Sequence, residues 1–180
     1  SKYGESKVAG EDLIAKQKVI NNVILRIFNL AGADPEGKFG EEHEPESHLI
    51  PLVINAAFTE NKISIFGDDY DTKDGTAVRD YIHVCDVANA FLTAGDHLMK
   101  GGDSHIFNIA SGQATSVKKI IEEIEQSLNK KISSNIMPRR EGDVAKLVAN
   151  IENAKAILGW QPEFSEIENI ISTAVKWHLK

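Results

Sequence analysis

Blocks of apolar and polar residues along this chain switch repeatedly between a helical and a strand-like period. Apolar positions at helical spacing run through residues 6–18, and a β-rich stretch follows at Val23–Phe28. The other strand-like runs are 63–66, 81–84, 105–109 and 132–137, and the other helical patterns are 48–58, 86–98, 116–128, 152–158 and 165–177. Strands that alternate with helices predict an α/β fold with a parallel sheet.

Particular side chains predict where several of these helices begin. Ser116 and Asn150 are residue types that cap helix N-termini. Asp86 carries a negative charge that suits the positive end of the helix expected to begin there. Ser165 and Glu168 have the spacing of a capping box, in which the serine hydroxyl would accept a hydrogen bond from the first turn.

Composition limits the kinds of partner that we expect. The formal net charge of the 180 residues is -7, which argues against a nucleic acid or an anionic membrane surface as partner. No apolar run is long enough to span a bilayer. The single cysteine, Cys85, excludes an internal disulfide and favours a packing role in a reducing cytosol, so we expect a cytoplasmic protein.

Tyr3 and Lys7 are the first pair with chemical potential. On a helix, residues four apart share one face and lie about 6 Å apart along the axis. A tyrosine hydroxyl is a weak base, but a neighbouring ammonium group stabilises its phenolate form. Such a pair suits proton transfer to or from a sugar hydroxyl. The alternative interpretation of the spacing alone is a solvated helix face.

Three segments carry a resemblance to a known family. Residues 3–7 read Tyr-Gly-Glu-Ser-Lys, residues 25–29 read Leu-Arg-Ile-Phe-Asn, and residues 79–86 read Arg-Asp-Tyr-Ile-His-Val-Cys-Asp. Together they resemble, in this order, the motifs of the extended short-chain dehydrogenases/reductases that act on nucleotide sugars. The resemblance implies bound NAD and a catalytic role for Tyr3 and Lys7, with Lys7 also contacting the nicotinamide ribose.

The same resemblance implies a fold. We expect the C-terminal part of a Rossmann-like parallel sheet together with a smaller mixed α/β substrate-binding domain. Residues 1–29 and 80–112 would belong to the remainder of the dinucleotide-binding domain. Residues 30–79 and 113–180 would form the nucleotide-sugar-binding domain, so that the two domains are interleaved along the chain.

Within this family, the chain is most similar to the UDP-glucose 4-epimerases. The long loop of residues 66–76, the Pro-Arg-Arg-Glu-Gly-Asp segment at 138–143 and the helix start at 48–51 all resemble theirs. The resemblance implies NAD-dependent interconversion of UDP-glucose and UDP-galactose at C4 through a 4-keto intermediate. A tight grip on UDP and loose contacts to the hexose would let the keto sugar turn over in the pocket.

The site residues follow from matching each motif position. Arginine forks suit phosphate oxygens, so Arg79 and Arg140 are expected at the diphosphate, with surface ion pairs as the alternative interpretation. Phe28 is expected at the cofactor, beside the catalytic pair. The expected substrate contacts are Asn29, His48, Leu49, Ser64, Ile65, Phe66, Arg79, Arg140, Asp143 and Leu147.

Four of these positions have a further interpretation. Leu147 stands where many glucose-specific relatives carry a tyrosine, so the smaller side chain favours a pocket that also admits UDP-N-acetylhexosamines. Asn29, Phe66 and Asp143 have plain structural alternatives, as a turn residue, a core residue and a turn residue. His43, His83, His105 and His178 share no metal-ligand spacing, and the acids at 42, 44 and 46 are interpreted as a solvated loop, so no metal is expected.

Other functions stay open on the sequence alone. The chain could belong to another UDP-sugar epimerase, acting on UDP-glucuronate or UDP-N-acetylglucosamine, or to a dehydratase with an Asp-Glu pair N-terminal to Tyr3. The sequence has no G-x-x-G-x-x-G turn to receive a pyrophosphate, so we expect an N-terminally truncated chain that by itself is inactive. The family resemblance also implies a homodimer that uses the helix of Tyr3.

Overall fold

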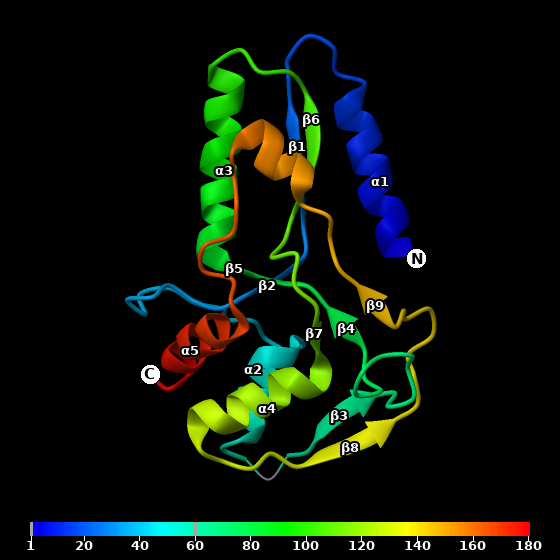
Figure 1. Cartoon of the computed structure of the whole chain (residues 1–180), viewed down its shortest axis with the longest axis vertical. Coiled ribbons are helices and arrows are strands. Elements are labelled where there is room, and N and C mark those ends of the chain that lie inside the picture. Colours follow the sequence, from blue (N-terminus) through cyan, green and yellow to red (C-terminus); the bar gives the residue numbers. More distant parts are fainter. Residues whose placement is uncertain (1, 60) are drawn as a thin grey trace.

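The fold is α/β, as the alternating pattern predicts. The computed structural model describes residues 2–59 and 61–180 (Figure 1). Its helices are α1 (Lys2–Ala15), α2 (Leu49–Ala56), α3 (Val84–Met99), α4 (Val117–Leu128), the π-helical η1 (Ala154–Leu158) and α5 (Ile167–His178). Its strands are β1 (Val23–Ile27), β2 (Asn29–Ala31), β3 (Ile63–Phe66), β4 (Val78–Arg79), β5 (Tyr81–His83), β6 (His105–Ile109), β7 (Thr115–Ser116), β8 (Ser134–Met137) and β9 (Lys146–Leu147).

The strands pair in small and mostly parallel sheets. β1 runs parallel to β6, β2 to β5 and β3 to β8. β4 is the middle strand of a three-stranded sheet, parallel to β9 and antiparallel to β7. This arrangement confirms the expected parallel pairing and brings segments far apart in the sequence into register, such as Phe66 opposite Met137.

Two hydrophobic clusters hold these elements together. In the first, α2, α4 and α5 pack over β3, and Ile54, Ile120, Ile124, Ile170 and Ile171 are almost completely buried. In the second, Phe107 and Ile109 of β6 pack against α3, η1 and the fully buried ring of Trp160. Figure 1 shows the two groups at opposite ends of the long axis, with β2 and β5 between them. The domain boundaries expected from the resemblance stay a prediction.

The predicted helix starts are partly right. The Ser116 hydroxyl accepts a hydrogen bond from the Lys119 N–H at 3.1 Å and caps α4 as predicted. The Asn150 side chain accepts one from the Glu152 N–H at 2.9 Å, but η1 begins only at Ala154 and has Asn153 as its N-cap residue. The predicted start at Asp86 is wrong, because α3 begins two residues earlier and His83 caps it. Likewise, α1 covers Lys2–Ala15 instead of 6–18.

The capping box predicted at Ser165 is also wrong. The N-cap residue of α5 is Glu166, and it makes no side-chain capping bond. The Ser165 hydroxyl instead donates to the buried Asp86 carboxylate at 2.5 Å, and the same carboxylate accepts the Glu163 and Phe164 N–H groups, each at 2.9 Å. Asp86 therefore organises the segment before α5, and it still lies in the first turn of α3, where its negative charge suits the positive helix end as expected.

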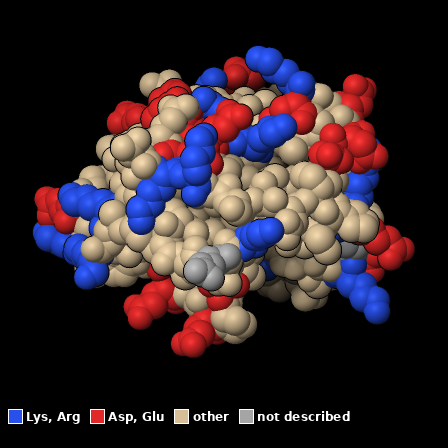
Figure 2. All heavy atoms as spheres, turned by 90° about the horizontal axis from the view of Figure 1, so that it is seen from below, with Lys and Arg blue, Asp and Glu red and all other residues tan. Residues whose placement is uncertain are grey.

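Surface charge is mixed where it can be seen. Figure 2 shows the face at the bottom of Figure 1, with basic and acidic side chains interspersed around an uncharged band. Among the residues that the structure describes, no helix has the length and apolar character needed to cross a membrane.

Candidate active site

The catalytic pair predicted from the sequence lies on one face of α1. The Lys7 Nζ is 5.2 Å from the centre of the Tyr3 ring, as the four-residue spacing requires. Tyr3 is 72% exposed, and α1 has no buried residue along its whole length. The helix is tied to β1 by an ion pair, in which Arg26 Nε donates to the Glu11 carboxylate at 2.7 Å. The phenol and the ammonium are thus adjacent and face open space.

Arg79 and Asp143 meet at the small sheet of β4 and β9. A guanidinium nitrogen of Arg79 forms an ion pair with the Asp143 carboxylate. Its other terminal nitrogen donates to the carbonyl oxygens of Val78 at 2.7 Å and Val144 at 2.9 Å. Leu147 is the register partner of Arg79. Parallel pairing of β4 with β9 therefore gathers three of the predicted substrate contacts.

Arg139 and Arg140, adjacent in sequence, have different partners. Arg139 anchors the loop after β3, since its Nε donates to the Asp69 carboxylate at 2.7 Å and its carbon Cζ lies 4.2 Å from the centre of the Tyr70 ring. Arg140 lies over the ring of Phe66, with Cζ 4.0 Å from the ring centre. Within the described part of the chain, the Arg140 guanidinium has no acidic partner. It is the arginine left available for an anion.

The hydrogen bond and ion pair from Arg139 lower the pKa of Asp69, against the opposing effect of desolvation. A Cβ atom at Gly75 would overlap the carbonyl oxygen of Asp68, and Gly75 has a φ of +81°. Glycine therefore lets this loop close tightly beside Arg139. The loop supports the strand that carries Phe66.

Arg140 and Asp143 are linked through the turn between β8 and β9. The Asp143 N–H donates to the Arg140 carbonyl oxygen at 3.2 Å. Because Asp143 also pairs with Arg79, the two arginines flank one turn. We name Phe66, Arg79, Arg140, Asp143 and Leu147 the arginine patch. It combines two guanidinium groups with an aromatic ring, groups that suit a diphosphate and a flat base.

The remaining predicted residues occupy neighbouring elements. Ser64 is exposed on β3 and Ile65 is buried under the same strand, in the first hydrophobic cluster. The side-chain amide of Asn29 donates to the Asp80 carbonyl oxygen at 2.7 Å, so this residue pins β2 to β5 and does not form a turn. Phe28 is half-buried between β1 and β2.

His48 and Leu49 stand at the start of α2. His48 is the N-cap residue, in an extended conformation and without a side-chain capping bond, and Leu49 is the first residue of the helix. No hydrogen bond, ion pair or ring contact connects either residue, or Tyr3 and Lys7, with the arginine patch among residues 2–59 and 61–180. The fold thus joins five of the predicted residues directly and places the others on separate elements.

Asp80 is a structural residue that the sequence reasoning missed. Its fully buried carboxylate accepts four hydrogen bonds. One oxygen accepts from the Ser111 N–H at 2.8 Å and hydroxyl at 2.6 Å, and the other accepts from the N–H groups of Gly112 at 3.0 Å and Ala149 at 3.2 Å. A charged residue directly before a strand of buried residues was the available signal. Asp80 fixes the backbone next to Arg79.

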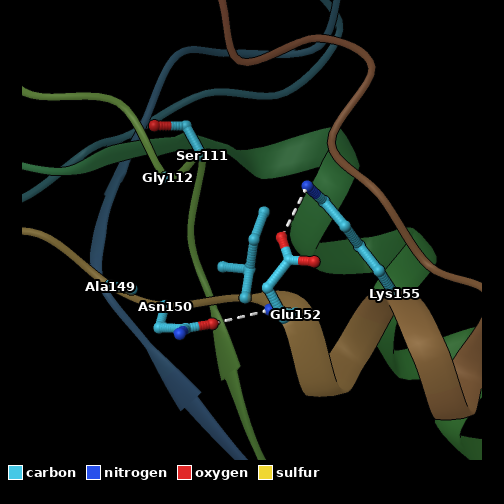
Figure 3. A pocket seen from close by; sticks show the side chains of 7 residues that line it. Ser111, Gly112, Ala149, Asn150, Glu152 and Lys155 are labelled. Atoms are coloured by element: carbon cyan, nitrogen blue, oxygen red, sulfur yellow. Dashed lines mark hydrogen bonds and ion pairs between the residues drawn. The ribbon is translucent and has the colours of Figure 1, made fainter.

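A shallow pocket of about 370 Å³ opens beside this network. Figure 3 shows Asn150, Glu152 and Lys155 on its rim, with Glu152 accepting from Lys155 and donating its N–H to Asn150. None of the predicted site residues lines this pocket. Its wall of satisfied polar groups belongs to the Asp80 network and to the start of η1.

Tyr81 is the titratable group most strongly affected near the site. Burial raises the pKa of its phenol to about 12, although the nearby Arg79 acts in the opposite direction. Tyr81 therefore stays protonated over the neutral range. It contributes to the first hydrophobic cluster and is unsuited to act as a base.

Known proteins with similar sequences belong to the family that the motifs resemble. The sequence profile of the NAD-dependent epimerase/dehydratase family matches residues 1–110. A UDP-glucose 4-epimerase of Halalkalibacterium halodurans is 47% identical over 180 residues, covering 98% of this chain and 54% of that protein.

Solved structures of UDP-glucose 4-epimerases are also similar to this chain. A crystal structure of UDP-glucose 4-epimerase from Brucella ovis in complex with NAD superposes with a TM-score of 0.92 at 38% identity, covering 96% of this chain and 55% of that chain. The enzyme from Bifidobacterium longum in complex with NAD+ and UDP gives a TM-score of 0.84 at 33% identity, covering 99% and 53%. The chain spans about half the length of these relatives and matches their C-terminal half, in agreement with the motif resemblance.

Proposed function

The chain belongs to the NAD-dependent epimerase/dehydratase family, and from this premise we propose that it carries the proton-transfer pair and the UDP-sugar site of a UDP-glucose 4-epimerase. The observation that carries the proposal is the arginine patch. Two arginines flank one turn, and the guanidinium of Arg140 lies over the Phe66 ring without an acidic partner in the described chain. Such an unpaired fork is suited to phosphate oxygens.

Tyr3 is the proposed acid/base. Its phenol oxygen takes the proton from the C4 hydroxyl of the sugar and returns it later, and the Lys7 ammonium, 5.2 Å from the Tyr3 ring centre, places a positive charge beside it. The exposed face of α1 fits the nicotinamide end of NAD, with Lys7 at the ribose and Phe28 close by. When bound, NAD supplies the hydride acceptor for the same carbon. The glycine-rich turn for the NAD pyrophosphate is not in this sequence.

Tight binding of the UDP group and loose binding of the hexose would allow the configuration at C4 to be inverted. Arg79 and Arg140 would grip the diphosphate, while Asp143 would accept from the ribose hydroxyls. The residues nearest the hexose offer few directional bonds, since Leu147 is apolar. Binding energy from the UDP moiety then retains the 4-keto sugar while its ring turns over.

Binding of UDP to the 180-residue chain tests the anchors directly. Isothermal titration calorimetry should show that Arg140→Met weakens UDP binding about 10- to 100-fold, because a charge-assisted bidentate contact is lost. Arg26→Met is the matched control, since that arginine is committed to Glu11 at the far end of the molecule. Equal UDP affinities of the wild-type chain and Arg140→Met would refute the assignment.

Catalysis is tested in a chimera that joins the N-terminal half of the Halalkalibacterium halodurans relative to this chain. The chimera should interconvert UDP-galactose and UDP-glucose. Tyr3→Phe should lower kcat by roughly 10²–10⁴-fold while it keeps UDP binding. Tyr70→Phe removes a buried hydroxyl that has no partner, so it should leave kcat unchanged. Full activity of a Tyr3→Phe chimera would reject Tyr3 as the acid/base.

A second substrate class is favoured by Leu147, which is 49% exposed beside Arg79. A side chain of this size leaves room for an acetamido group where a tyrosine would fill the space. We expect the chimera to act also on UDP-N-acetylgalactosamine and Leu147→Tyr to lose that activity selectively. An unchanged ratio of the two activities in Leu147→Tyr would remove the substrate extension and leave the epimerase proposal in place.

A further inference from the structure

Four side chains with metal-binding atoms converge in the segment between β2 and α2. One ligand atom from each of Glu41, His43, Glu46 and His48 lies within 4.8 Å of all the others. The Nδ1 atoms of His43 and His48 are 3.7 Å and 3.6 Å from the same oxygen of Glu46. His48 Nδ1 also contacts a Glu41 oxygen. Two imidazoles and two carboxylates thus face one point.

Two of these separations are close to those in a tetrahedral metal site. Zinc bonds of about 2.0–2.2 Å to nitrogen and oxygen place neighbouring ligands roughly 3.3–3.6 Å apart. The two contacts of Glu46 are close to this edge length. The contact between His48 and Glu41 is shorter, so an ion would replace that direct contact. Two carboxylates and two neutral imidazoles carry a combined charge of -2, which a divalent cation neutralises.

The surrounding structure holds the ligands in place. The N–H groups of Ser47 and His48 donate to the Glu46 carboxylate at 2.7 Å and 2.8 Å, which fixes its orientation. Glu46 is 16% exposed and Glu41 is 26% exposed, whereas the His48 ring is 62% exposed and leaves an entry path from solvent. The indole N–H of Trp177 donates to the Glu41 carbonyl oxygen at 2.9 Å and ties the segment to α5.

His48 has an additional feature that points to a ligand. It occupies the N-cap position of α2, yet its side chain makes no capping bond and turns toward the two carboxylates. The ring of His43 stacks on that of His48, with centres 5.3 Å apart and planes inclined by 28°. Stacking holds both Nδ1 atoms on the side of the acids.

We propose that Glu41, His43, Glu46 and His48 form a binding site for a divalent transition-metal ion, with Zn²⁺ as the reference ion. Imidazole and carboxylate ligands in a tetrahedral arrangement suit Zn²⁺ better than Mg²⁺ or Ca²⁺, which prefer oxygen ligands alone. Four protein ligands make a closed site, so the ion is structural and takes no part in the reaction.

The ion links the segment to the start of α2. With the metal bound, residues 41–48 are cross-linked at one end of α2, while Trp177 anchors them on α5. One consequence rests on the proposed function: the ion would hold His48 and Leu49 in position for the UDP-sugar. Metal binding itself does not depend on that function.

Zinc titration of the 180-residue chain tests the site. After removal of metals with a chelator, competition with a chromophoric chelator should show one tightly bound Zn²⁺ per chain. His43→Gln and Glu46→Gln should each weaken binding at least about tenfold, because each removes a ligand. Glu44→Gln, an acid of the same segment outside the cluster, and His105→Gln, a β6 histidine outside the cluster whose ring meets His97 edge-on, are matched controls with unchanged affinity.

The coordination geometry of the bound ion can be tested by absorption spectroscopy. Co²⁺ in the wild-type chain should give the intense visible absorption of a tetrahedral site, and the double variant His43→Gln/Glu46→Gln should lack it. Absence of stoichiometric Zn²⁺ binding, or a double variant that binds as tightly as the wild type, would overturn the proposal. Arg140→Met should bind Zn²⁺ normally, so failure of the metal site and failure of the UDP site are distinguished.

Discussion

Replacement of Asp80 by asparagine probes the network behind Arg79. The buried carboxylate accepts two hydrogen bonds at each oxygen, from Ser111 on one side and from Gly112 and Ala149 on the other. An asparagine side chain has one oxygen and one NH₂ group. With the NH₂ group toward Gly112 and Ala149, two donors face another donor; with it toward Ser111, one N–H does, because the hydroxyl can turn to accept. Hydrogen bonds to a charged group contribute about 1.5–3 kcal/mol each, so the loss of one or two predicts a destabilisation of roughly 1.5–6 kcal/mol.

Urea unfolding followed by circular dichroism measures this loss. With a slope of about 2 kcal/mol per molar urea, the midpoint of Asp80→Asn should fall by about 2 M. Asp71→Asn, an exposed acid in the preceding loop, should shift the free energy of unfolding by less than about 0.5 kcal/mol. Should Asp80→Asn fail to fold, Ser111→Ala removes the hydroxyl that donates to Asp80 and accepts from the Gln113 N–H, and it should cost about 1–3 kcal/mol. A loss below about 1 kcal/mol in Asp80→Asn would refute the reasoning.

Three further predictions concern buried groups. Burial raises the pKa of Tyr81 to about 12, so the unfolded chain releases the phenol proton at lower pH than the folded chain does. The free energy of unfolding should therefore fall by roughly 1 kcal/mol between pH 9.5 and 11, and this loss should be absent in Tyr81→Phe. Desolvation lowers the pKa of His83, so the unfolded chain binds more protons in acid than the folded chain does. As the pH drops below about 6.5, the urea midpoint should therefore decrease, and His83→Gln should remove this decrease. Ile170→Ala should cost about 2–5 kcal/mol in the same assay, and the exposed Ile157→Ala under about 1 kcal/mol; equal losses would contradict the assigned core.

The elements with strong local patterns were predictable. Residues 63–66 and 105–109 form strands with the predicted bounds, because β-branched and aromatic residues at a period of two favour that conformation. Ser116 caps α4 as predicted, since its partner is only three residues away. The resemblance to the epimerase family could also be recognised from the sequence, because each family motif is a contiguous run of residues.

The prediction of a helix end was wrong where a distant residue binds the side chain that was expected to cap the helix. Ser165 has the spacing of a capping box, but its hydroxyl is bound to Asp86, 79 residues away. Asp86 lies in the first turn of α3, as its charge suggested, but it also accepts two backbone N–H groups from the segment before α5. These bonds satisfy a buried carboxylate, and their donors lie too far away in the sequence for a local pattern to reveal them.

The sequence alone determined the α/β class, most of the elements and the facing of Lys7 onto Tyr3, since each depends on neighbours a few residues apart. Only the tertiary structure decided that Arg139 is committed to Asp69 while Arg140 is not, and that Arg79 meets Asp143. It also decided that Glu41, His43, Glu46 and His48 converge, since an irregular segment has no period that a spacing argument can use. Contacts of this kind depend on how distant strands register and how loops close, and no local pattern encodes them.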